Sequence, residues 1–145
     1  MHISGHTQSW EKGMPGLLTQ CYDPFGKNAI GNKFGPMDPT KASVFNFLAE
    51  FYSEIGEVFP DEMIHIGGDE VNLKCWKSNP RILDVMDLWN ITGDFRQLES
   101  HFIESVLQIV DKLPGNKQSL GKYMKEEINI FKPDHHYLTT TRSDF

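Results

Sequence analysis

One convincing strand between two amphipathic helices is the feature that most limits what this chain can fold into. The run EMIHIGG (62–68) holds two isoleucines and closes on glycines, which is typical of a buried strand. Apolar residues recur at helical spacing before it, from about Asp38 to Pro60, and after it, from about Asp94 to just before Gly115. Helices and strands that alternate in units of this length favour parallel βαβ crossovers, so we predict an α/β fold.

The two ends of the chain lack such a pattern. Residues 1–39 are rich in Gly, Pro and Asn, and we predict one long irregular segment there. The aromatic residues expected to pack this segment are Trp10, Tyr22, Phe25 and Phe34. The only further strand candidates are a stub at MHIS (1–4) and a short run at Ile128 to Phe131. These few strands are not enough to form a buried sheet. We therefore expect the chain to be a piece of a larger α/β domain, and to be unstable or aggregation-prone on its own.

The composition indicates one globular domain and argues against nucleic acid and anionic membranes as partners. The 145 residues are 39% hydrophobic and carry a net charge of −6, with the basic residues scattered. Binding to nucleic acid or to an anionic membrane is therefore disfavoured. No apolar run approaches the roughly 20 residues of a membrane span, and the residues after Met1 do not have the pattern of a secretory signal.

Two cysteines and one sequon bear on the cellular compartment. Cys21 and Cys75 are too far apart for a CxxC redox or zinc motif, and spacing alone leaves open whether they are free thiols or one long-range disulfide. The triplet Asn90-Ile91-Thr92 would accept a glycan in a secretory compartment, although such triplets also arise by chance. Together they weakly favour an oxidising compartment.

Asp69 and Glu70 are the candidate catalytic groups. They follow Gly67 and Gly68 at the end of the predicted strand, and ligands of parallel α/β folds bind at the carboxyl ends of strands. The glycines allow a sharp turn with room for a ligand. A partly desolvated carboxyl beside a second negative charge holds its proton near neutral pH. We therefore expect one carboxyl to act as a general acid while its neighbour stays ionised.

Simpler interpretations compete with this one. A bare GGDE is more often a loop with a helix-capping Asp and a solvated Glu. A metal site would use His65 with Asp69 and Glu70, but neither histidine spacing nor a second cluster supports it. We expect His65 to be a hydrogen-bonded core residue. Trp10 and Trp76 are expected to be packing residues rather than platforms for a sugar.

Five segments in order carry a family resemblance. They are GHTQSW (5–10), GMPGLLTQCY (13–22), HIGGDEV (65–71), CWKSNP (75–80) and FRQLES (95–100). Together they closely resemble the β-N-acetylhexosaminidases of glycoside hydrolase family 20, over about three quarters of the chain. The resemblance implies a (β/α)8 TIM barrel, of which residues 1–115 would supply about two βα units around the fourth strand. Residues 116–145 would form a divergent tail.

The resemblance also implies a mechanism. Family 20 is an exception to the scheme with two protein carboxylates facing the sugar, because the substrate assists its own cleavage. Glu70 would be the acid/base, and Asp69 would orient the 2-acetamido group that attacks C1. His6 would lie near Glu70 and tune it, its alternative being a loop histidine bonded to the backbone. Cys21 and Cys75 match a pair that is disulfide-bonded in the animal lysosomal members.

The implied enzyme removes terminal N-acetylglucosamine or N-acetylgalactosamine from glycoconjugates, with no metal or organic cofactor. It would be lysosomal or secreted, and dimeric. Two departures stand out: MHISGH (1–6) replaces an EFDTPGH-like lead-in, and no tryptophan follows Trp89. A truncated splice form, an incomplete transcript or a frameshift would explain the second departure. The alternative function is a non-catalytic fragment acting as an interaction module; a small binding domain that carries GGDE by chance is remote.

Overall fold

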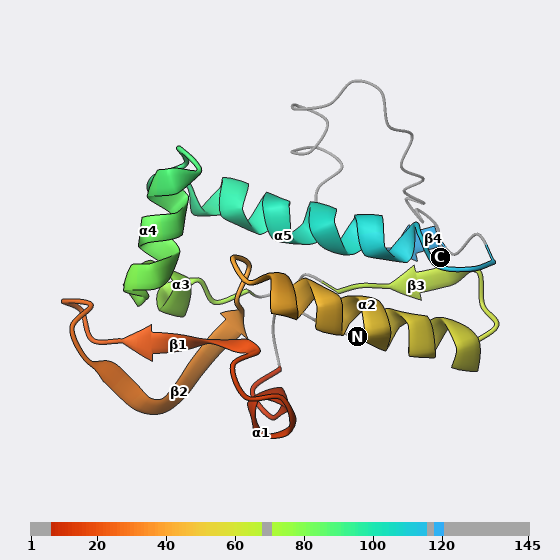
Figure 1. Ribbon diagram of the computed structural model, residues 1–145, viewed down its shortest axis with the longest axis horizontal. Helices are drawn as coiled ribbons and strands as arrows, with labels where there is room; N and C mark the ends of the chain where they lie inside the picture. The colour runs from red at the N-terminus through yellow and green to blue at the C-terminus, as the bar shows by residue number, and fades with distance from the viewer. Residues whose placement is uncertain (1–6, 68–70, 116–117, 121–145) are drawn as a thin grey trace, which may run out of the picture.

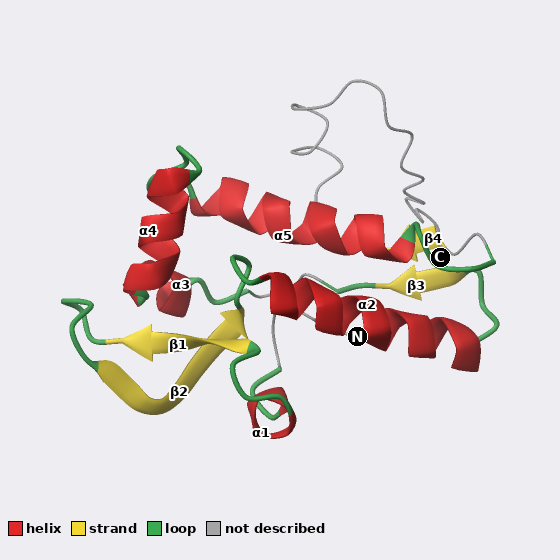
Figure 2. Ribbon diagram, viewed as in Figure 1, coloured by secondary structure: helices red, strands yellow, loops and turns green. Residues whose placement is uncertain are grey.

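The computed structural model describes residues 7–67, 71–115 and 118–120. Figures 1 and 2 show two long helices running side by side, with a β-hairpin and two shorter helices gathered near one end of the pair. The helices are α1 (Trp10–Gly13), α2 (Ala42–Val58), α3 (Lys74–Ser78), α4 (Pro80–Leu88) and α5 (Phe95–Val110). The strands are β1 (Leu18–Tyr22), β2 (Ala29–Met37), β3 (Met63–His65) and β4 (Gln118–Leu120).

The predicted pair of amphipathic helices is confirmed as α2 and α5, which pack together through the main core. The buried residues of that core are Leu17, Leu18, Met37, Val44, Leu48, Tyr52, Ile66, Phe102, Ile103, Val106 and Val110. On α2 the buried positions recur every four residues, so one stripe of the helix faces α5. The side chain of Asp94 caps α5 by accepting from the Gln97 N–H at 3.0 Å.

Helix α2 begins later than the sequence suggests. Pro39 does not open the helix, because Asp38 forms a local turn in which its carboxylate accepts from the backbone N–H and the hydroxyl of Thr40. Lys41 is still extended, and the helix starts at Ala42.

The predicted strand and its parallel crossover are confirmed, with one correction. Strands β3 and β4 pair in parallel, and α3, α4 and α5 lie between them in sequence. The expectation that the strand is buried is wrong: Met63 is 46% exposed, and Ile66, just past the strand, is the residue that is fully buried. Strand β4 (Gln118–Leu120) was not predicted, because Gln-Ser-Leu offers no apolar run.

Residues 7–39 are not one irregular segment, and that prediction is wrong. They form α1 and the antiparallel hairpin of β1 and β2. From Leu18 to Gln20 the chain advances two residues along β1 while the paired position moves three residues along β2, and from Gln20 to Tyr22 it moves five. These bulges on β2 remove the regular alternation of apolar and polar residues by which a strand is recognised in a sequence. Of the four aromatic residues expected to pack here, Phe25 is 83% exposed, whereas the other three are partly buried.

The segment between β3 and α5 contains two helices, α3 and α4, that hydrophobic periodicity did not predict. Asn79 begins α4: its side-chain oxygen accepts from the N–H groups of Arg81 and Ile82, and Pro80 occupies the first turn. A second core of Trp76, Ile82, Met86 and Leu98 joins these helices to α5.

Three predictions on the chain ends lie outside the described residues. They are the stub strand at 1–4, the strand at 128–131 and the division of the chain at residue 115 into barrel and tail. In the part of the chain that the structure describes, no helix is both long and apolar enough to cross a membrane.

His101 of α5 links the two long helices to the end of α4. Its ring makes edge contacts with Phe45 on α2, at 5.9 Å between centroids, and with Trp89, at 4.7 Å. Burial lowers the pKa of His101 below its usual 6.5, and the negative charge of Glu104 opposes that shift.

We therefore expect His101 to make the protein less stable in acid. Since the folded pKa is depressed, the unfolded chain binds the proton more readily, and stability falls as pH drops below about 6.5. Thermal unfolding measured from pH 7.5 to pH 4.5 should show a shallower loss in His101→Gln, and a steeper one in Glu104→Gln. Parallel curves for wild type and His101→Gln would contradict this assignment.

Candidate active site

The chain leaves β3 through two buried residues. Ile66 is 1% exposed and Gly67 is buried. Gly67 has φ of 78°, a region that glycine adopts without strain. Its N–H donates to His65 Nδ1 at 3.0 Å, which fixes the direction in which the chain leaves the strand.

The predicted catalytic residues Asp69, Glu70 and His6 lie outside the described residues, so their positions stay predictions. His65 is described and is exposed, so placing it in the core was wrong. Strand β3 alternates, which turns Ile64 toward the core and His65 to the other face. The hydrogen bond expected for His65 is present, but it is local.

The segment that begins at Cys75 is attached to the β1–β2 hairpin. Cys75 forms a disulfide with Cys21 of β1, as the resemblance implied. The next residue, Trp76, is fully buried, and its Nε1 donates to the Met37 carbonyl oxygen at 3.1 Å. Trp10 packs against Phe47 and Phe51 of α2. Both tryptophans are packing residues, as predicted.

Two polar side chains of the same segment complete this attachment. Ser78 Oγ accepts from the Tyr22 N–H at 3.0 Å, and Asn79 Nδ2 donates to the Gln20 carbonyl oxygen at 3.0 Å. Both bonds are made to backbone groups of β1. The motif CWKSNP therefore has a structural role: it docks the start of α3 and α4 onto the hairpin.

Gly35 allows this docking to be close. A Cβ atom at Gly35 would lie 2.5 Å from Cys75 Cβ and 2.9 Å from its Sγ. Any side chain would therefore push the disulfide away from β2, so the position requires glycine.

A buried carboxylate holds the far end of β2. Asp38 is 1% exposed and pairs with Arg81 of α4 and with Lys41, whose Nζ lies 3.5 Å from Asp38 Oδ2. Lys41 Nζ also donates to the Gly16 carbonyl oxygen at 2.7 Å. This carboxylate thereby joins the hairpin, the start of α2 and the first turn of α4.

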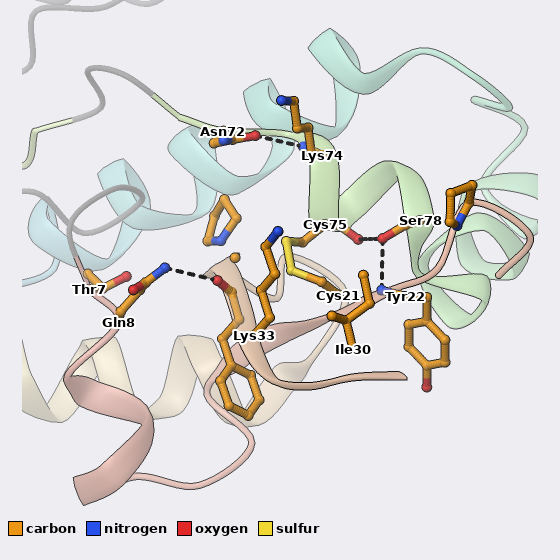
Figure 3. Close-up of a pocket in the computed structure, with 14 residues that line it drawn as sticks. Thr7, Gln8, Cys21, Tyr22, Ile30, Lys33, Asn72, Lys74, Cys75 and Ser78 are labelled. Carbon is orange, nitrogen blue, oxygen red and sulfur yellow. Dashed lines mark hydrogen bonds between the residues drawn. A yellow bond between two sulfur atoms is a disulfide. The ribbon is translucent and has the colours of Figure 1, made fainter. Parts of the chain in front are cut away.

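A cavity of about 500 Å³ opens beside the disulfide, within the size range of small-molecule sites. Figure 3 shows Thr7 and Gln8 on one side of it and Asn72 and Lys74 on another, with Lys33 extending past the disulfide. Gln8 Nε2 donates to the Phe34 carbonyl oxygen at 3.3 Å, and Asn72 Oδ1 accepts from the Lys74 N–H at 3.1 Å.

Sequence reasoning missed this cavity. Its lining comes from three separate segments, within 7–8, 21–36 and 72–78, and no local sequence motif indicates that these segments lie close together. Among the described residues, no group of three or more His, Cys, Asp or Glu side chains is arranged to hold a metal ion.

Asn90 lies in an exposed turn after α4. The Asn90 and Ile91 N–H groups donate to the carbonyl oxygens of Asp87 and Met86, which closes the helix end, and Asn90 has a left-handed φ of 58°. Thr92, the hydroxyl residue of the sequon, donates to Asp87 Oδ1 at 2.6 Å.

Comparison with known proteins assigns the fold and the family. The beta-hexosaminidase subunit beta of Mus musculus is 47% identical over 126 residues, which are 87% of this chain and 23% of that protein. The Homo sapiens subunit beta is 48% identical over 116 residues, 80% of this chain and 20% of that protein. The chain thus spans less than a quarter of the length of the curated relatives it matches.

Solved structures agree. A family 20 exo-β-N-acetylglucosaminidase from Vibrio harveyi, in complex with N-acetylglucosamine, superposes with a TM-score of 0.66 at 26% identity, covering 83% of this chain and 19% of that one. A β-N-acetylhexosaminidase structure at 21% identity shares the fold, with a TM-score of 0.64 over 86% of this chain and 26% of that one.

The family model described as glycosyl hydrolase family 20, catalytic domain, matches residues 1–131. The predicted resemblance is confirmed: this chain belongs to glycosyl hydrolase family 20, a family of glycosidases, and carries part of its catalytic domain.

Proposed function

We propose that the chain is the part of a β-N-acetylhexosaminidase that carries the catalytic acid. The observation behind this proposal is the family match over residues 1–131, which contains the sequence GGDE shortly after β3. The parallel β3–β4 pair, with helices between its strands in sequence, supports assigning them to neighbouring strands of a (β/α)8 barrel. Active sites of such barrels lie at the carboxyl ends of the strands.

In the proposed reaction Glu70 protonates the glycosidic oxygen as the bond to C1 breaks. The substrate's own 2-acetamido oxygen attacks C1, and Asp69 orients that group and stabilises the oxazolinium that forms. Glu70 then acts as base for the water that opens this intermediate, so the product keeps the configuration of the substrate. His6 assists Glu70 by setting its environment.

This division of work explains why two carboxylates are adjacent. Retaining enzymes with a protein nucleophile separate their two carboxyl groups across the scissile bond. A nucleophile that belongs to the sugar removes that need, and both side chains can act from adjacent positions in the sequence. The substrates are glycoconjugates that end in a β-linked N-acetylhexosamine.

The test is release of 4-methylumbelliferone from its β-N-acetylglucosaminide by the purified protein. Glu70→Gln should lower kcat by about 10²–10⁴-fold, because the leaving oxygen loses its proton donor. Asp69→Asn should also lower kcat, and the β-glucoside, which lacks the acetamido group, should not be cleaved.

Glu62→Gln is the matched control, since it makes the same chemical change at an exposed residue just before β3. Its kcat should equal that of wild type. Equal kcat in wild type and Glu70→Gln would refute the role of Glu70. No release by any of these proteins would favour the alternative, an interaction module without chemistry.

We further propose a lysosomal or secreted, dimeric complete enzyme. The Cys21–Cys75 disulfide supports the compartment, because such bonds persist where the environment is oxidising. Asn90 is proposed as a glycan acceptor, since it is exposed and begins the sequon.

Protein secreted from cultured animal cells should therefore lose mass on treatment with an amidase that removes N-glycans. Asn90→Gln should abolish the part of that loss that maps to this site. A peptide that contains unmodified Asn90 in every molecule would contradict the assignment.

A further inference from the structure

We propose that Asp38 is a positioning residue for the reaction, acting through Arg81. Its buried carboxylate holds the start of α4, and with it α3, at the place where the end of β2 leads into α2. The inference rests on the proposed function, because the chemistry that it serves is that of Asp69 and Glu70. It adds to that chemistry a residue that is distant in sequence and acts without touching the substrate.

Described residues on both sides of the proposed acid are held at the end of β2. Ile66, four residues before Glu70, belongs to the same buried core as Met37, the residue before Asp38. Trp76, six residues after Glu70, donates through Nε1 to the Met37 carbonyl oxygen at 3.1 Å. Met37 is thus part of the core that holds Ile66 and accepts the bond that holds Trp76.

Asp38 extends this attachment to α4. It is 1% exposed, and both of its carboxylate oxygens have partners. Oδ1 accepts from the Thr40 N–H at 3.0 Å and from the Thr40 hydroxyl at 2.6 Å. Oδ2 pairs with Arg81 and, at 3.5 Å, with Lys41. A buried carboxylate needs such partners, because an uncompensated charge is costly where water is excluded.

The ion pair restrains a motion that the other attachments permit. The disulfide and the hydrogen bonds of Ser78 and Asn79 all reach residues of β1. A segment held along one strand can still rotate about that strand. The pair of Arg81 with Asp38, which lies past the end of β2, opposes this rotation. Reaction rates depend on the orientation of the reacting groups as well as on their distance, so this restraint bears on kcat.

Kinetics of variants on the methylumbelliferyl β-N-acetylglucosaminide test the proposal, at a temperature below every unfolding transition. Asp38→Asn and Arg81→Gln should each lower kcat about tenfold and leave KM within about twofold, because the sugar still binds while the reacting groups are misoriented. Arg81→Lys keeps the charge and should stay within about threefold of wild type. The double variant should be no slower than Asp38→Asn, since both changes break one ion pair.

Lys41→Gln is the matched control. Lys41 pairs with the same carboxylate and loses the same charge, but it stands at the start of α2 and not in the segment after β3. Its Tm should fall, because Asp38 loses one of its two cations, while its kcat should stay within about twofold of wild type. Equal kcat in wild type and Arg81→Gln, equal losses in Lys41→Gln and Arg81→Gln, or additive losses in the double variant would overturn the proposal.

Amide hydrogen exchange gives a readout that needs no turnover. Amides of residues 72–78 should exchange about tenfold faster in Asp38→Asn and Arg81→Gln than in wild type, and at the wild-type rate in Lys41→Gln. Unchanged exchange in the first two variants would overturn the proposal. The expected exchange in a protein that hydrolyses nothing would refute the proposed function and retain the attachment through Asp38.

Discussion

The Cys21–Cys75 disulfide, which packs closely against Gly35, is the contact on which the rest of the structure depends. Cys21 and Cys75 are 54 residues apart in sequence, so their bond closes a loop worth roughly 4 kcal/mol in the chain-entropy model. The bond forms because the backbone at Gly35 leaves room for Cys75. Trp76 follows Cys75 directly and is buried in the second core, where its indole N–H donates to the Met37 carbonyl oxygen.

For function, the disulfide matters because it fixes the position of the chain close to the proposed catalytic residues. The chain leaves β3 through Gly67, and by Cys75 it is anchored to the hairpin. The described residues on either side of the proposed catalytic pair are thus held, Ile66 by the core and Cys75 by a covalent bond. Positioning of this kind matters because a displacement of about 1 Å at a reacting group can cost roughly 10²-fold in rate. Asp38 reinforces the same arrangement by pairing with Arg81.

Sequence periodicity predicted the elements whose burial follows one face. Helices α2 and α5 were found because their apolar residues recur at helical spacing, and β3 because it is a short apolar run. The hairpin was missed because bulges on β2 destroy its alternation, and α4 because its capping signal, Asn79-Pro80, was assigned only to the family motif. Strand β4 (Gln118–Leu120) is specified by its pairing with β3, which no local pattern encodes.

The candidate site likewise has one part that the sequence predicted and one part that it did not. The motif around Asp69 and Glu70 could be recognised from sequence, because adjacent residues carry the chemistry. The cavity could not, because Gln8, Lys33 and Lys74 come together only through the fold. Long-range closeness of this kind depends on the register of the hairpin and on where the Cys21–Cys75 bond places α3.

The most direct test of this account is the kcat of a Cys21→Ser, Cys75→Ser protein on the methylumbelliferyl β-N-acetylglucosaminide. It would be measured at a temperature below the unfolding transitions of both proteins, with near-UV circular dichroism to show that the variant is folded. The account predicts that kcat falls by about 10-fold to 10²-fold, because Cys75, which follows the proposed acid Glu70 closely in sequence, loses its bond to the hairpin. An unchanged kcat in a folded protein without the disulfide would contradict it.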